Sequence, residues 1–456
     1  MITTPPADDA LISSEEADAL LAPLRQWPVL ALAVSGGGDS LALMHLAVDW
    51  AKRVASEGAA APRLHVLTVD HGLQAHSTRV AQDVCRRAAR LGLPCAVLRW
   101  RGEKPASGIE EAARGARYDL MARWCARHRA ALVTAHTLED QFETFLMRLA
   151  RGSGLDGLCA MAEQTRLPAS DAFVPLLRPL LTVSRTRLRA TLRGLGEQWH
   201  EDPANRDARF ERVRWRRLLP LLREAGITPR AIAAATRRLH RARAALERQV
   251  EAFLRAHVAV HPTGHVLVER SAFEDLPEEM RLRALAELMG RLGGTGDRLR
   301  DMAGLERLLA WLQTESGRAR VLAGAHLARR KRALVIGREP GRPGPEALLP
   351  PGESTTITWD NRYRIEVANL HVPLRVMMLA RALKHAPENE KDLPTRPAHV
   401  PAFAWRAQPA LVRGAETTGE RTPSPVFIAA LPALGWHSPD APFDMARAKF
   451  LFPGGS

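Results

Sequence analysis

The chain has 456 residues, enough for two or three domains with cores of their own. Hydrophobic residues make up 46% and charged residues 25%, as in water-soluble globular proteins, and no stretch approaches the ~20 apolar residues of a membrane span. The net charge of +15 and the pI near 10.8 indicate a polyanionic partner, although a GC-rich coding bias would also favour arginine.

Cysteine usage and the N-terminal residues indicate a cytoplasmic protein. The four cysteines are widely spaced and form no C-x-x-C pair, which speaks against a zinc ribbon or a dithiol redox motif. They are Cys85, Cys95, Cys125 and Cys159. We expect them to be reduced, as is usual in the cytoplasm. Residues 1–17 show neither the basic region nor the apolar core of a signal peptide.

The first half of the chain alternates strand and helix patterns. It begins with an amphipathic helix over residues 12–26, for which Ser13 or Ser14 is the expected N-cap. Strands are predicted at residues 28–34, 64–69, 95–100, 131–135 and 173–181. Helices are predicted to begin at residue 41 and to span 78–91, 109–128 and 138–151. This alternation predicts an α/β fold with a doubly wound parallel sheet.

The stretch Ser35-Gly36-Gly37-Gly38-Asp39-Ser40 joins the first strand to the first helix of this sheet. Glycines let backbone N–H groups approach an oxyanion, and the helix N-terminus adds partial positive charge. A carboxylate in such a cradle repels phosphate unless a divalent cation bridges the two, so Asp39 predicts Mg²⁺ together with a nucleotide. The alternative is a tight turn in which Asp39 only caps the helix.

Polar residues also follow two other predicted strands. Asp70 and His71 come after the second strand, and the segment from His136 to Asp140 follows the fourth. Ligands of doubly wound sheets bind beyond the carboxyl ends of the strands. We therefore expect these residues to share a pocket with the glycine loop.

A strongly basic segment follows the sheet. Residues 178–248 hold 18 arginines, no lysine and 7 acids, a net charge of +11. Interleaved arginine and tryptophan suit phosphate contacts and base stacking, so we expect RNA contacts here. The candidates are Arg178, Arg209, Arg212, Arg214, Trp215, Arg216 and Arg217. The alternative is a solvated helical face with Phe210 and Trp215 in the core.

The remaining chain predicts two further regions. Residues 218–220 are expected to end the basic region, and a long helix is expected over 229–257. A smaller α+β domain follows over 260–340, with helices near 279–293 and 296–314 and a hairpin of 320–327 with 333–337. The tail opens with strands at 355–359 and 364–367, and part of 384–425 is expected to be disordered. The expected domains are 1–220, 221–340 and 341–456.

The glycine loop resembles the pyrophosphate-loop signature of N-type ATP pyrophosphatases, and residues 35–40 are called the PP-loop below. The resemblance implies an adenine nucleotide α-hydrolase-like fold that cleaves ATP between its α and β phosphates and adenylates a substrate oxygen. The Walker-type pattern G-x-x-x-x-G-K-S/T is absent from the sequence, which disfavours chemistry at the γ-phosphate.

Further stretches, in order along the chain, are similar to the tRNA(Ile)-lysidine synthetase family. They are residues 69–73, 110–118, 135–144 with Arg148, 151–154, 178–181, 201–205 and 209–220. The similarity is good over roughly 28–220, loose over 228–340, and faint in the tail, as in a degenerate domain, chiefly at 359–363. The chain departs from the family pattern at Gln74, Glu139, Val213 and Trp215.

The resemblance implies a ligase that attaches free lysine to carbon-2 of the wobble cytidine in the isoleucine tRNA with a CAU anticodon. The implied route is an adenylated tRNA, with release of AMP and pyrophosphate. The implied ATP-binding residues are Ser35, Gly36, Gly37, Gly38, Asp39, Ser40, Asp70 and His71, with Mg²⁺ on Asp39. The implied catalytic residues are Asp39, Arg114, His136, Asp140 and Glu143. A homodimer is common in the family.

Several alternatives remain open in the sequence. His136 could be a strand-end histidine satisfied by backbone, and Glu143 could be an exposed helical charge. Arg117 and Tyr118 are expected to be structural or to face RNA. Another PP-loop enzyme such as a tRNA thiolase usually carries paired cysteines, which are absent from the sequence. A non-catalytic basic RNA-binding protein would have no need of the assembled acids and His136.

Overall fold

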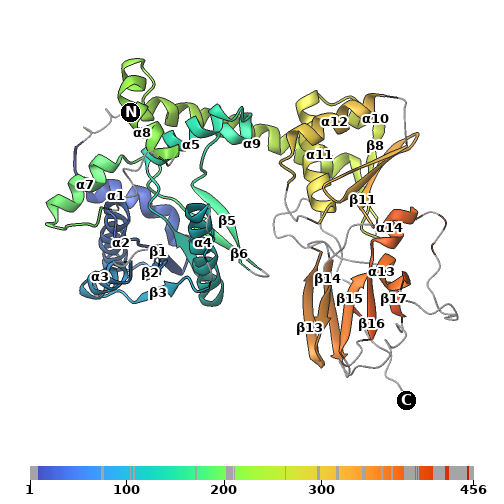
Figure 1. The fold of residues 1–456 in the computed structure, drawn as a ribbon, viewed down its shortest axis with the longest axis horizontal. Coiled ribbons are helices and arrows are strands. Elements are labelled where there is room, and N and C mark those ends of the chain that lie inside the picture. The colour runs from blue at the N-terminus through green and yellow to red at the C-terminus, as the bar shows by residue number, and fades with distance from the viewer. Residues whose placement is uncertain are drawn as a thin grey trace. The chain divides into compact units, whose positions relative to one another are not determined.

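The computed structural model describes residues 9–72, 77–102, 104–105, 108–169, 172–201, 209, 211–261, 263–294, 298–314, 318–340, 346–360, 363–370, 373–384, 396, 398, 400–413, 427–430 and 449–450. Its contacts divide the chain into two compact units, Met1–Arg243 and Ala244–Ser456 (Figure 1). Within the described ranges, no helix is both long and apolar enough to cross a membrane.

A six-stranded sheet in the order β3-β2-β1-β4-β6-β5 forms the centre of the first unit. Its strands are β1 (Val29–Ala33), β2 (Arg63–Asp70), β3 (Cys95–Arg99), β4 (Ala131–Val133), β5 (Gln164–Ala169) and β6 (Ala172–Leu177). All neighbouring strands except β5 and β6 pair in parallel, which confirms the predicted parallel sheet. The antiparallel edge strand β5 was not predicted, because half of its residues are polar and only the last of them is buried.

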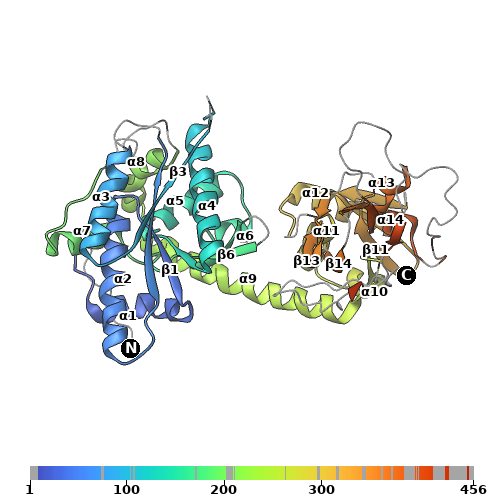
Figure 2. The ribbon, with the colours of Figure 1, turned by 90° about the horizontal axis from the view of Figure 1, so that it is seen from below.

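Helices cover both faces of this sheet, as the doubly wound prediction requires (Figure 2). They are α1 (Ser14–Leu21), a 3-10 turn (Ala22–Gln26), α2 (Gly38–Ser56), α3 (Ser77–Arg90), α4 (Ile109–His128), α5 (Leu138–Ala150), α6 (Leu155–Leu158), α7 (Arg185–Gly194) and α8 (Glu211–Glu224). One core contains apolar side chains of α1, α2, α3 and α7. A second core packs α4 against the other face. The predicted N-cap is confirmed at Ser13, whose Oγ accepts from the N–H of Glu16.

Residues 218–220, where the basic region was expected to end, do not interrupt the helix that they belong to. Pro220 lies inside α8, which continues to Glu224. An interior proline costs a helix about 3 kcal/mol. Leu219 and Leu222 of α8 pack against the cluster of Phe142 and Leu146 on α5, and this tertiary burial offsets the cost.

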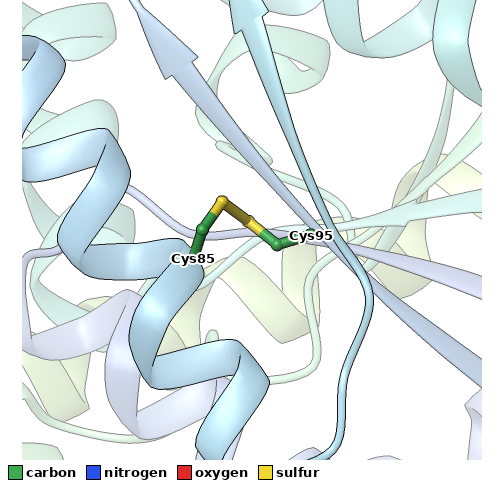
Figure 3. Close-up of a disulfide and its surroundings, with 2 residues drawn as sticks. All are labelled: Cys85 and Cys95. Carbon is green, nitrogen blue, oxygen red and sulfur yellow. A yellow bond between two sulfur atoms is a disulfide. The ribbon is translucent and has the colours of Figure 1, made fainter.

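A disulfide joins α3 to β3, which corrects the expectation of four reduced cysteines (Figure 3). Cys85 and Cys95 are separated by 10 residues, and their Cα atoms lie 5.3 Å apart because β3 runs back beside α3. The spacing alone gave no sign of this return. Cys125 and Cys159 are free and buried, and burial raises the pKa of the Cys125 thiol to about 12.

The second unit begins within α9 (Pro229–His257), the long helix that the sequence predicted. A five-stranded sheet has the order β7 (Val258–Val260), β8 (Val266–Glu269), β11 (Ala333–Arg338), β10 (Ala325–Arg329) and β9 (Ala319–Leu322). Its helices are α10 (Arg270–Glu274), α11 (Glu278–Leu292) and α12 (Met302–Gln313). The strand expected at 320–327 is divided in two, because Ala323 and Gly324 turn the chain with φ of 50° and 82°.

The tail forms two small sheets. One pairs β13 (Gly352–Trp359), β14 (Tyr363–Leu370) and β18 (Lys449–Phe450), which confirms the strands predicted at 355–359 and 364–367. The other has the order β12 (Ala347–Leu349), β15 (Leu374–Met378), β16 (Pro409–Arg413) and β17 (Phe427–Ala430). The tail also holds α13 (Leu379–Lys384) and α14 (Ala402–Arg406). Of the stretch expected to be partly disordered, residues 385–395 and 414–425 lie outside the described residues.

Candidate active site

The PP-loop forms a tight turn from β1 into α2. Gly36 has a φ of 84°, and a Cβ at this position would lie 2.9 Å from Cγ1 of Val80, so both backbone conformation and space require glycine. The Ser40 hydroxyl donates to the carbonyl of Gly37 over 2.9 Å and accepts from the N–H of Ser35 over 3.1 Å. The loop is therefore held open as a cradle at the N-terminus of α2, as an anion site requires.

A pocket of about 880 Å³ opens beside this loop at the carboxyl ends of the strands. Besides the loop, the residues that matter for its chemistry are His71, Arg117, Tyr118, His136, Arg185, Arg189, Arg193, Trp199 and Arg216. The structure thus brings the PP-loop, the end of β2 and the end of β4 to one pocket.

Arg185, at the start of α7, connects four acids around the pocket. Its guanidinium contacts one oxygen each of Asp39, Asp140 and Glu143, at 3.1, 2.5 and 3.3 Å. Its backbone N–H donates to Glu139 over 3.0 Å. Burial alone would lower the pKa of Arg185, but Asp140, Glu143 and Asp39 raise it above its usual value. No local sequence pattern marks Arg185 as a site residue, because its side-chain partners lie 42 to 146 residues away.

Asp39 combines a desolvated carboxylate with the phosphate cradle. Burial raises its pKa to about 6, Asp140 adds to the rise, and Arg185 and Arg189 oppose it. Such a carboxylate needs a cation, which Arg185 supplies here. In the part of the chain that the structure describes, no three histidine, cysteine or acidic residues form a ready metal cluster. A single hard oxygen ligand beside phosphates nevertheless fits Mg²⁺, which keeps several waters and takes its other ligands from substrate phosphates.

His136 is a neutral imidazole at the end of β4. Burial lowers its pKa to about 3, although the neighbouring Asp140 acts in the opposite direction. Its Nδ1 lies 2.9 Å from the hydroxyl of Thr134, so a side chain rather than backbone provides this hydrogen bond. His136 lines the pocket and is uncharged at neutral pH.

Asp140 has one structural and one site-facing oxygen. Its Oδ2 accepts from the N–H and the hydroxyl of Thr137, each over 2.9 Å, which completes a capping box at the start of α5. Its Oδ1 faces Arg185, with Arg212 3.8 Å away. Burial opposes ionisation, but Arg185 and the hydrogen bonds from Thr137 outweigh it and keep the pKa of Asp140 below its usual value.

The alternative that Glu143 is an exposed helical charge is wrong. Its side chain is 1% exposed, and it faces the site from α5. Besides Arg185, it accepts from Nε of Arg216 over 2.5 Å and from Nη2 of the same residue over 3.1 Å. Two arginines therefore neutralise one buried carboxylate, which fixes its position.

The other predicted site residues lie at different places. The carboxylate of Asp70 accepts from Ser77, Thr78 and the N–H of Gly72 and holds the turn before α3, whereas His71 lines the pocket. The hydrogen bond from Ser77 is the main cause that lowers the pKa of Asp70. Arg114 stacks over the ring of Tyr118 at 5.4 Å. Arg117 and Tyr118, expected to be structural or to face RNA, both line the pocket.

The predicted RNA-binding residues of α8 divide between two faces. Arg212 and Arg216 point to Asp140 and Glu143, whereas Arg214 and Arg217 are exposed. Trp215 packs beside Phe142 and Leu146, which agrees with the alternative of a core tryptophan. The side chain of Arg214 donates to the carbonyl of Arg209, which is exposed. Arg178 donates to the carbonyl of Ala162 over 2.7 Å. Phe210, Gln74 and residues 202–205 lie outside the described residues.

A family model and several curated proteins are similar to this chain. A family model described as a PP-loop domain matches residues 11–222. The chain is 46% identical to the tRNA(Ile)-lysidine synthase of Bradyrhizobium diazoefficiens over 339 residues, which are 73% of this chain and 89% of the relative. It is 44% identical to the tRNA(Ile)-lysidine synthase of Bradyrhizobium sp. over 365 residues, 75% of this chain and 99% of the relative.

Solved structures resemble the chain only weakly. A U34-tRNA thiolase, NcsA from Methanococcus maripaludis, aligns with a TM-score of 0.41 at 15% identity, over 50% of this chain and 77% of that chain. This likeness is too low to support an argument.

Proposed function

The chain belongs to the tRNA(Ile)-lysidine synthase family, and we propose that it uses ATP to attach lysine to carbon-2 of the wobble cytidine in an isoleucine tRNA with a CAU anticodon. The observation that carries this proposal is the pocket itself. It joins a phosphate cradle to a neutral histidine, and two arginines of its lining, Arg185 and Arg216, hold the buried carboxylates behind it in place. Free lysine, ATP and the tRNA are the substrates.

The first step is adenylation of the cytidine. The carbonyl oxygen on carbon-2 attacks the α-phosphorus, an oxygen–phosphorus bond forms, and the bond to the leaving pyrophosphate breaks. The PP-loop and the N-terminus of α2 would hold the phosphates. Asp39 would hold Mg²⁺, which lowers the cost of the charge that develops on pyrophosphate. Neutral His136 can donate or accept a hydrogen bond next to the base without adding charge.

The second step replaces the adenylated oxygen with lysine. The ε-nitrogen of lysine attacks carbon-2, the carbon–oxygen bond breaks, and AMP leaves. The ε-ammonium must first pass a proton to solvent, because its pKa is near 10.4 in water and only the neutral amine attacks. Asp140 and Glu143 would position this group, and Arg114 would balance charge on the adenylated intermediate. Exposed arginines of α8 would contact the tRNA phosphates. We propose that the reaction takes place in the cytoplasm.

Other PP-loop chemistry is less well supported. A thiolase needs accessible sulfur at the site, and in the described part of the chain no cysteine lines the pocket. A non-catalytic RNA-binding protein would not need the buried, paired carboxylates of Asp140 and Glu143, whose desolvation costs stability.

One assay tests the proposal. The full chain is incubated with ATP, Mg²⁺, labelled lysine and a transcript of the CAU-anticodon tRNA, with a transcript in which the anticodon is GAU as the control. We expect label in the CAU transcript only, with one AMP and one pyrophosphate for each lysine. AMP formation without label in RNA, or equal labelling of both transcripts, would refute it.

A further inference from the structure

Two arginines of α7 line the pocket and, among the described residues, form no ion pair with the acids that Arg185 contacts, although Arg189 helps to lower the pKa of Asp39. Arg189 and Arg193 are four residues apart and therefore lie on one face of α7. The Cζ atom of each lies 5.7 Å from the ring centroid of Trp199. Like charges at this spacing repel each other, so the arrangement favours an anion between or beside them.

Trp199 places these arginines at the PP-loop. A Cβ on Gly38 would meet the ring of Trp199 at 3.4 Å, so the indole lies against the first residue of α2. The next residue, His200, donates its N–H to the carbonyl of Gly36 over 3.0 Å. The guanidinium groups of Arg189 and Arg193 therefore stack on Trp199, whose side chain contacts the PP-loop.

The segment that carries Trp199 is anchored on both sides. Arg87 of α3 contacts Glu197 over 2.6 Å, and Asp83 lies 3.2 Å from Nε2 of His200. These contacts fix the segment on α3 before any ligand enters. A platform fixed in advance lowers the ordering cost of binding.

Asp39, Asp140 and Glu143 form no ion pair with Arg189 or Arg193 among the described residues, so both guanidinium groups can bind an anion. Arg189 contacts Glu201 over 3.3 Å, but its Nε is buried and has no hydrogen-bond partner among the described residues. Arg193 has no carboxylate partner within the same ranges. Arg185 and Arg216, in contrast, are taken up by Asp39, Asp140 and Glu143.

We propose that Arg189 and Arg193, stacked on Trp199, form a subsite for the β- and γ-phosphates of ATP and for the pyrophosphate that leaves. The reaction it serves rests on the proposed function, whereas the subsite requires only that the pocket binds ATP. Its ligand class is a diphosphate rather than a nucleoside or an RNA phosphate, because the platform touches the PP-loop. Guanidinium groups bind phosphate oxygens through paired hydrogen bonds and suit this ligand.

Calorimetric titration of the full chain with inorganic pyrophosphate and, separately, with AMP, both in Mg²⁺, tests the subsite. We expect Arg193→Gln and Arg189→Gln each to weaken pyrophosphate binding about tenfold and to leave AMP binding within twofold. Trp199→Leu removes the platform and should weaken pyrophosphate binding about threefold. Arg123→Gln, an exposed change on α4 at a residue paired with Asp119, is the matched control and should change neither.

Unchanged pyrophosphate affinity in both arginine variants would overturn the subsite, as would equal losses for pyrophosphate and AMP. Weaker tRNA binding with unchanged pyrophosphate binding would also overturn it and would make the arginines an RNA contact. Wild-type protein that formed no lysidine, but lost pyrophosphate binding through Arg193→Gln, would contradict the proposed function and still support the subsite.

Discussion

One guanidinium, that of Arg185, contacts three acids beside the pocket. Arg185 contacts Asp39 from the PP-loop and Asp140 and Glu143 from α5, and only 20% of its side chain is exposed. Removing one partner of a buried ion pair leaves the other charges uncompensated. Arg185 is therefore a positioning residue whose loss affects both folding and the first chemical step.

Arg185→Gln should lower the free energy of unfolding by about 3 kcal/mol and reduce adenylation at least tenfold. Arg185→Lys keeps the positive charge but loses the planar guanidinium that donates several hydrogen bonds at once. It should therefore restore part of the stability and part of the adenylation rate. Urea unfolding and the rate of pyrophosphate release measure the two effects. The control is Arg53→Gln, which removes a surface pair with Asp18 and should cost at most about 1 kcal/mol. A loss no larger than this control would contradict the role of Arg185.

The buried carboxylate of Asp39 lowers the free energy of unfolding at neutral pH. Its pKa in the folded protein, about 6, lies above the ordinary value of 3.8, so its ionisation is harder in the folded than in the unfolded chain. The stability of the ligand-free protein should therefore fall as pH rises from about 4 to 6, and the penalty is complete above pH 6.

Asp39→Asn should consequently be more stable than the wild type at pH 7.5 by roughly 2 kcal/mol, should lose most of this advantage at pH 5 or below, and should not release pyrophosphate. Thermal unfolding at the two pH values in the absence of nucleotide measures this. A variant less stable than the wild type at pH 7.5 would show that Arg185 fully compensates the buried carboxylate.

Residues that directly follow a strand were predictable as a site, whereas residues that reach the pocket from a helix were not. The PP-loop, His71 and His136 follow strands directly, so strand ends identified them. Arg185 and Trp199 reach the pocket from α7 and the segment after it. Their contacts depend on how α7 packs on α2, and no local pattern records that packing.

At the scale of elements, α8 divides its charge between the pocket and solvent. Arg212 and Arg216, one helical turn apart, face the acids of α5, while Arg214 and Arg217 face solvent. We expect the exposed pair to contact RNA phosphates, because Arg212 and Arg216 are engaged with buried carboxylates.

The double variant Arg214→Gln and Arg217→Gln should weaken tRNA binding and reduce the slope of log affinity against log salt by about two, with ATP affinity unchanged. Arg216→Gln should instead impair adenylation through Glu143 and leave the salt slope nearly unaltered. Filter binding over a range of salt concentrations separates the two. Equal effects of both variants on tRNA affinity would contradict this division of the helix.

The disulfide ties α3 to the sheet edge. In the chain-entropy description, closing a loop of 10 residues contributes about 2–3 kcal/mol. Cys85→Ser should lower the melting temperature by several degrees without changing the residues that line the pocket. Added reductant should reproduce the shift in the wild type and have no effect on the variant. Identical melting of oxidised and reduced wild-type protein would show that the bond contributes nothing.

Alternation of apolar runs predicted the five parallel strands and the helices between them, because buried strands and amphipathic helices carry strong periodic patterns. The same patterns failed at β5, which is half exposed, and at Pro220, where packing on α5 overrides the proline. The turn at Ala323-Gly324 divides a stretch whose apolar pattern predicts a single strand. These differences share a cause, because tertiary contacts outweighed the local secondary-structure preference of the residues.

At the scale of the whole molecule, the ATP chemistry belongs to the first unit. The residues that line the pocket lie between Ala33 and Arg216, within Met1–Arg243. The second unit has a hydrophobic core of its own around α11 and α12. The net charge of +15 accounts for attraction to a tRNA, and the pocket accounts for chemistry on one of its bases.

The fate of one oxygen atom tests this account most directly. A CAU-anticodon transcript labelled with oxygen-18 at carbon-2 of the wobble cytidine is incubated with the full chain, ATP, Mg²⁺ and lysine. The mass of the AMP that is released is then measured by mass spectrometry. Adenylation of the carbonyl oxygen predicts one oxygen-18 in each AMP and none left on carbon-2 of the modified base. Unlabelled AMP formed together with lysidine would contradict the adenylated intermediate.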